Sequence, residues 1–97
     1  MNNDNTPVYN QIALRIVEAQ ESIIGPIALE RAQHVAGLRL DPSTSTVAIV
    51  GDPAIVIDEL IGQYKEIFGQ ISVDVCRDAT SKLVVKLPQE LIPSLLR

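Results

Sequence analysis

The sequence predicts one helix-rich α+β domain with two N-terminal helices, a small β-hairpin, one or two further helices and a short apolar C-terminal segment. Three observations lead to this prediction. Two long stretches repeat their apolar residues with helical period, a β-branched run follows turn-forming residues between them, and a chain of 97 residues has the size of a single domain. Residues 1–7 are polar and are expected to form a flexible tail before the domain of residues 8–97.

The first helix is expected over residues 8–24. Its apolar residues repeat along one helical face: Ile12, Ile16, Ala19 and Ile23. Pro26 interrupts this pattern, because proline lacks an amide hydrogen and is well accepted only in the first turn of a helix. A second helix is therefore expected over residues 26–36, followed by Gly37, which tolerates a positive φ. The residues expected to be buried in it are Ala28, Leu29, Ala32, Val35 and Ala36.

Residues 38–50 predict a small hairpin, because apolar and charged residues alternate, turn-forming residues follow, and a β-branched run closes the segment. The third helix is expected to end at Phe68. Its start is marked by Asp52, whose carboxylate can accept the free amides of a first turn, and by Pro53, which suits the first helical position.

Residues 70–87 allow two interpretations. Read as a strand, apolar residues alternate with polar ones from Ile71; read as a helix, apolar residues share one face. We favour a helix over residues 70–81, followed by an extended segment over residues 83–87. Residues 88–97 are rich in leucine and are expected to form a short apolar helix or a docking tail.

Composition argues against several classes of function. The net charge is −4, the basic residues are scattered along the chain and only 3% of residues are aromatic, which is unlike a nucleic-acid-binding surface. No apolar run reaches the length of about 20 residues that spans a bilayer, and no signal peptide is recognisable, so we expect a cytoplasmic protein without membrane contact. The single cysteine allows no intramolecular disulfide.

Residues with chemical potential are few. His34 has no neighbour at metal-ligand spacing, and Cys76 falls on an apolar helical face, where a free cysteine behaves as a small hydrophobe. The carboxylates of Asp74 and Asp78 alternate with basic residues, which is typical of a solvated helix face. Gly51 stands alone before a helix, whereas phosphate loops use several glycines. We therefore predict no catalytic residue, no metal and no cofactor.

The mean hydropathy of +0.20 is high for so short a chain. A domain of this size leaves much of its surface exposed, so apolar side chains should form a contiguous exposed area, which generally marks an interface. We expect a homodimer, with a further protein partner as an option. The expected interface combines two aromatic residues of the third helix with the C-terminal leucine-rich segment: Tyr64, Phe68, Leu91, Ile92, Leu95 and Leu96.

The function favoured by the sequence is a non-catalytic protein–protein interaction module, a small adaptor or regulatory subunit that acts as a homo-oligomer. The alternative is a carrier of a small apolar or lipid-like ligand, in which the aliphatic residues would line a pocket. An enzyme that uses Cys76, His34 or the Asp74 and Asp78 pair is the third hypothesis.

Overall fold

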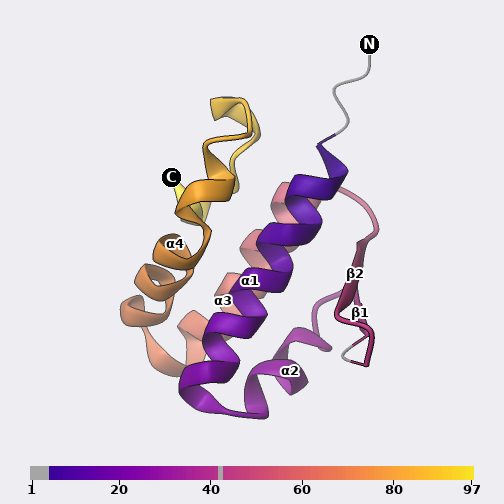
Figure 1. The fold of residues 1–97 in the computed structure, drawn as a ribbon. Coiled ribbons are helices and arrows are strands. Elements are labelled where there is room, and N and C mark those ends of the chain that lie inside the picture. Colours follow the sequence, from indigo (N-terminus) through magenta and orange to yellow (C-terminus); the bar gives the residue numbers. More distant parts are fainter. Residues whose placement is uncertain (1–4, 42) are drawn as a thin grey trace.

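The computed structural model describes residues 5–41 and 43–97 (Figure 1). The elements in order are α1 (Thr6–Ile24), α2 (Ile27–Ala32), β1 (Leu38–Asp41), β2 (Thr46–Ile49), α3 (Pro53–Phe68), α4 (Gln70–Val84), and the 3-10 helices η1 (Gln89–Leu91) and η2 (Ser94–Leu96). The predicted helix-rich α+β class is confirmed.

The helix α1 lies in the middle of the fold and packs against α2, α3, α4 and β2. Its buried residues cover a wide arc of the helix: Tyr9, Ile12, Ala13, Ile16, Val17 and Gln20. Figure 1 shows why so wide an arc is buried: α4 flanks α1 on one side, α2 and the hairpin flank it on the other, and α3 lies behind. The helix begins at Thr6, two residues before the expected start, and residues 1–4 of the expected tail lie outside the described residues.

The second helix is shorter than predicted, because α2 ends at Ala32 instead of continuing to residue 36. Past Ala32 the chain makes tighter turns, in which the amide of Val35 donates to the carbonyl of Ala32 and the amide of Leu38 donates to that of Val35. These turns bring Val35 and Leu38 into the core but leave Ala36 exposed, although the helical pattern placed it on the buried face.

Gly37 has the positive φ that the sequence suggested, but it does not end a helix. It starts the hairpin, where the amide of Val50 donates to its carbonyl over 2.7 Å. A Cβ at Gly37 would stand 2.6 Å from the carbonyl oxygen of Val50, so only glycine fits this close approach of two backbones. The two strands pair in antiparallel register, with Leu38 opposite Ile49. Pro42, part of the expected hairpin turn, lies outside the described residues.

The start of α3 is confirmed as predicted. The side chain of Asp52 accepts from the amides of Ala54 (3.0 Å) and Ile55 (3.5 Å), and Pro53 is the first helical residue. Gly69, with a φ of 75°, ends α3 and is the single residue between α3 and α4, so the chain reverses there and α4 packs against both α3 and α1.

The ambiguous residues 70–87 are helical in their first 15 residues, and the expected extended segment over residues 83–87 is wrong. The reason is that the buried face keeps its helical period up to the end of α4, through Cys76, Thr80 and Leu83, and a last turn then buries Leu87. Packing against α1 and α3 outweighs the preference of the valines at the end of α4 for extended structure.

The C-terminal segment, residues 88–97, packs against its own chain. Three helices each hold it with one polar side chain: the hydroxyl of Tyr9 donates to the carbonyl of Leu91, the carboxylate of Asp58 accepts from the amides of Ser94 and Leu95, and the guanidinium of Arg77 donates to the carbonyl of Leu95. Pro93 is also buried. Of the two forms expected for this segment, the structure therefore shows short helices that pack on their own chain, η1 and η2, instead of a docking tail.

We expect Asp52→Ala to lower the free energy of unfolding by about 1 kcal/mol, because two amides of the first turn of α3 lose their acceptor. Denaturant titration measures this, with Glu59→Ala, an exposed carboxylate in the middle of α3, as a control that changes it by less than about 0.5 kcal/mol. Equal effects of the two variants would show that Asp52 does not cap the helix.

We expect Asp58→Ala to release the C-terminal segment, because this carboxylate accepts three hydrogen bonds from Ser94 and Leu95. The loss should be about 1–2 kcal/mol in the free energy of unfolding, and the amides of Ser94 and Leu95 should exchange faster with deuterium. Asp58→Asn keeps one acceptor oxygen and should have a smaller effect. Unchanged exchange of these two amides in Asp58→Ala would contradict the assignment.

Candidate functional site

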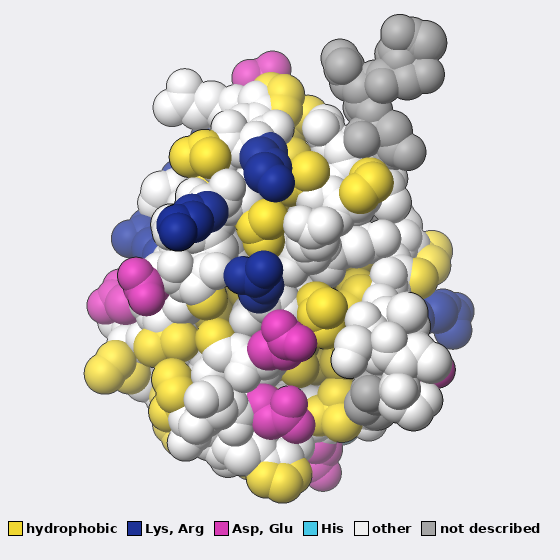
Figure 2. Space-filling view, viewed as in Figure 1, with side chains coloured by type: hydrophobic (Ala, Val, Ile, Leu, Met, Phe, Trp, Pro, Cys, Tyr) yellow, Lys and Arg dark blue, Asp and Glu magenta, His cyan; other side chains and the backbone are white. Residues whose placement is uncertain are grey.

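An apolar surface lies where α1 and α3 end and α4 begins. We call it the helix-end patch; its exposed members are Ile23 (61% exposed), Phe68 (41%) and Ile71 (68%). They surround a hollow of about 140 Å³ whose lining is almost entirely apolar: Gln20, Ile23, Ile24, Phe68, Ile71, Ser72 and Val75. Hydrophobic side chains gather in this region at the lower left of Figure 2.

The local sequence explains why these side chains are exposed. Ile23 belongs by its spacing to the face of Ile12 and Ile16, which are fully buried, but it lies in the last turn of α1 before Gly25. Phe68 is the last residue of α3, and Ile71 is the second residue of α4. All three residues therefore lie at helix ends beside chain reversals, where fewer neighbours are available to cover them.

The structure separates the residues of the interface predicted from sequence. Tyr64 is fully buried, and its hydroxyl donates to the carbonyl of Ala28 over 2.7 Å, so its assignment to an interface is wrong. Burial also raises the pKa of Tyr64. Leu96 is buried in the same chain as well. Ile92 and Leu95 are half-buried against the core, which leaves Phe68 and Leu91 as the exposed members of the set.

Cys76 is fully buried, as the sequence predicted. Burial raises the pKa of its thiol, although the hydrogen bond from Gln20 acts in the opposite direction. The amide nitrogen of Gln20 donates both to the sulfur of Cys76 (3.4 Å) and to the carbonyl of Ser72 (3.1 Å). A neutral, enclosed thiol of this kind is a poor nucleophile, because thiol reactivity depends on the thiolate.

The other candidates remain apart from one another. His34 is exposed and borders a shallow depression with Glu59 and Glu66, while Asp74 and Asp78 lie on the exposed face of α4. Among residues 5–41 and 43–97, no group of three or more His, Cys, Asp or Glu side chains is placed to hold a metal ion. Asp74 accepts a hydrogen bond from the side-chain amide of Gln70 over 3.2 Å, and within the described residues no hydrogen bond joins His34, Cys76, Asp74 or Asp78 to one another.

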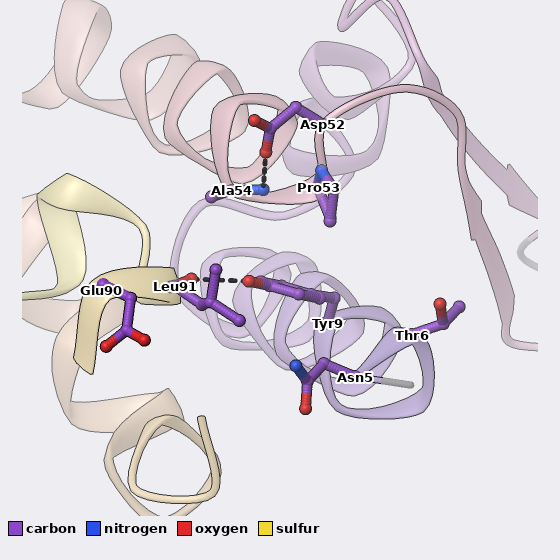
Figure 3. Close-up of a pocket in the computed structure, with 8 residues that line it drawn as sticks. All are labelled: Asn5, Thr6, Tyr9, Asp52, Pro53, Ala54, Glu90 and Leu91. Atoms are coloured by element: carbon purple, nitrogen blue, oxygen red, sulfur yellow. Dashed lines mark hydrogen bonds between the residues drawn. The ribbon is translucent and has the colours of Figure 1, made fainter. Parts of the chain in front are cut away.

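A second depression, of about 470 Å³, lies between the first turns of α1 and α3 and the helix η1 (Figure 3). Its polar groups already serve the fold. The hydroxyl of Tyr9 donates to the carbonyl of Leu91 over 2.6 Å, and the carboxylate of Asp52 caps α3. Burial and, to a smaller extent, the charge of Asp52 raise the pKa of Tyr9, so its phenol stays protonated and keeps this hydrogen bond.

Folding also gathers charges that are scattered in the sequence. Arg15 of α1 lines one depression between α1 and the end of α4 together with Lys82, Lys86 and one carboxylate, Asp78. The sequence could not reveal this group, because its members come from two ends of the chain. The sequence analysis also did not predict that Ile23 and Ile71 are exposed. The spacing of apolar residues identifies an apolar helix face, but it does not show where along the helix this face stops being covered by other elements.

We compared the chain with protein-family models, with curated proteins and with solved structures, and none of the three comparisons finds a match. No helix in the described part of the chain is long and apolar enough to cross a membrane.

We expect Cys76 to react with a thiol reagent at least about a hundredfold more slowly in the folded protein than in the unfolded chain, because the reagent must wait for the helix to open. Spectrophotometric titration of the thiol measures the two rates. A Ser81→Cys variant supplies an exposed thiol on the same helix and should react fast. Fast modification of Cys76 in the folded protein would contradict this expectation and would support the hypothesis of a reactive cysteine.

Proposed function

We propose that this protein is a non-catalytic protein–protein interaction module, a small cytoplasmic adaptor or regulatory subunit that acts as a homo-oligomer. The observation that carries the proposal is the helix-end patch, in which Ile23 and Ile71 are each more than half exposed around one apolar hollow. Contiguous exposed apolar surface on a small domain generally marks a contact with another protein.

The shape of the patch favours a protein partner over a small ligand. Pockets that enclose a small molecule usually have volumes of about 300–1,000 Å³, whereas the apolar hollow measures about 140 Å³. The larger depression beside Tyr9 has polar groups that already bond to the backbone. The carrier hypothesis is therefore less well supported than the interaction module.

The enzyme hypothesis lacks an assembled set of reacting groups. Nucleophilic catalysis needs a nucleophile within hydrogen-bond reach of a base, and the sulfur of Cys76 instead accepts a hydrogen bond from the amide of Gln20. Its free, buried thiol fits a protein that stays in a reducing compartment, which supports the cytoplasmic part of the proposal.

We expect the wild-type protein to show a mass that increases with concentration over the micromolar range, and Ile71→Asp to abolish this increase. Ile71 is 68% exposed and lies in the first turn of α4, where an acidic residue is favourable, so the variant should keep its fold. Sedimentation across a dilution series measures the mass.

The matched control is Ile55→Asp. Ile55 is 56% exposed and lies in the first turn of α3, away from the helix-end patch, so this variant should associate like the wild type. A monomeric wild-type protein at every concentration would refute self-association, and equal behaviour of the two variants would show that the patch is not the contact.

A further inference from the structure

Along the exposed side of α4 and the residue that follows this helix, Val85, the residue types have nearly the same order in both directions. The row is spaced by three or four residues, which places its members on one helical face: Ile71, Asp74, Asp78, Lys82 and Val85. All five are exposed, and the two apolar ends are 68% and 79% exposed. Asp78 is the midpoint, with an acidic residue four positions before it and a basic residue four positions after it.

The row of one helix is complementary in charge to the same row of a second helix that runs in the opposite direction. When a second identical helix lies antiparallel on the row, with residue 78 opposite residue 78, the apolar ends meet and each acid meets a base. We propose that a second copy of this chain docks α4 against α4 in this way, around a two-fold axis at Asp78. Ile71 then contacts Val85 of the partner subunit, and Asp74 pairs with Lys82 of the partner subunit. The inference rests on the proposed function as a homo-oligomer.

The neighbouring helix α1 extends the charge pattern. Gln20 bonds to Ser72 and Cys76, so α1 and α4 lie antiparallel in a fixed register, and Arg15 falls beside Lys82 at the basic end. Further along α1, Glu18 and Glu21 are three residues apart, and both border a depression on the side of α1 that faces α2 and β1. Figure 2 shows Lys and Arg side chains above Asp and Glu side chains on this face.

Charge also selects the direction of docking. Each chain carries a net charge of −4, so two copies repel one another at long range, and a contact that pairs opposite charges offsets part of this repulsion. A parallel arrangement would place Lys82 against Lys82 of the partner subunit and Asp74 against Asp74 of the partner subunit. The antiparallel arrangement leaves a single pair of like charges, the two Asp78 carboxylates at the axis.

The size of the surface requires that α1 contributes. The row from Ile71 to Val85 is about 21 Å long, and the face of one helix is about 10 Å wide. The area of this helix face is less than the roughly 800 Å² that each partner buries in a standard interface. The side of α1 that carries Arg15 widens the contact, and the helix-end patch around Ile23 adds apolar area at each end.

The test exchanges the charges. Asp74→Lys alone and Lys82→Asp alone each place two pairs of like charges in a homodimer, and each should weaken self-association at least about tenfold. An equimolar mixture of the two variants should restore association, because the heterodimer again contains two pairs of opposite charge. Native mass spectrometry separates homodimers from heterodimers by mass, and sedimentation gives the dissociation constants.

The controls separate charge pairing from net charge and from folding. Glu59→Lys and Arg39→Asp change the charge equally at exposed positions of α3 and β1, and they should neither weaken association strongly nor favour a heterodimer when mixed. Thermal unfolding of each variant at monomeric dilution shows that it folds. Asp78→Asn removes the like-charge pair at the axis and should tighten the dimer severalfold.

The outcomes distinguish the two proposals. A wild-type dimer whose charge variants behave like the controls, with no preference for the heterodimer, overturns the antiparallel α4 contact and leaves the proposed homo-oligomer standing. A wild-type protein that is monomeric at every concentration overturns both. A mixture that forms heterodimers in preference to either homodimer supports the contact.

Discussion

The buried amide of Gln20 is the interaction on which the arrangement of this fold depends most. It lies between α1 and α4 and donates to the carbonyl of Ser72 and the sulfur of Cys76. Gln20 is 2% exposed, and leaving its buried amide without a partner would lower the stability of the fold by about 1–3 kcal/mol. The helices α1 and α4 therefore cannot slide past one another without that cost. This bond therefore fixes the register of the two helices that form the proposed contact surface.

The register has consequences at both ends of the helix pair. At one end it places Ile23 beside Ile71 and creates the helix-end patch; at the other it places Arg15 beside Lys82. Part of the apolar surface of α3 and α4 is covered by the C-terminal segment, which Asp58 and other helix side chains hold against the core. The chain thus covers one side of its bundle with its own residues and leaves the helix-end patch exposed.

The sequence predicted the elements whose signals are local. The start of α3 is marked by Asp52 and Pro53, and the hairpin by its turn residues, so both were placed correctly. The end of α2 was missed, because the turns after Ala32 depend on Val35 and Leu38 reaching a core that other elements form.

The candidate site was less accessible to prediction than the fold. Tyr64 and Phe68 share one apolar face of α3, and periodicity alone does not tell that the first is enclosed while the second lies at the rim. Likewise, the sequence analysis assigned the leucines of the C-terminal segment to an interface with another chain. In the structure, Asp58 and Arg77 hold the backbone of Leu95 against the same chain. Both errors concern which neighbour covers an apolar residue, and this is decided by contacts between residues far apart in the chain.

The most direct test of the account is an isotope-filtered NMR measurement on an equimolar mixture of labelled and unlabelled chains. Only contacts between two copies give signals in this experiment. We expect intermolecular nuclear Overhauser effects between the methyl groups of Ile71 and those of Val85, which lie about 21 Å apart along α4 in one chain. Intermolecular signals from Leu95 and Leu96 without any between Ile71 and Val85, or no intermolecular signal at concentrations where a dimer forms, would contradict the proposed contact.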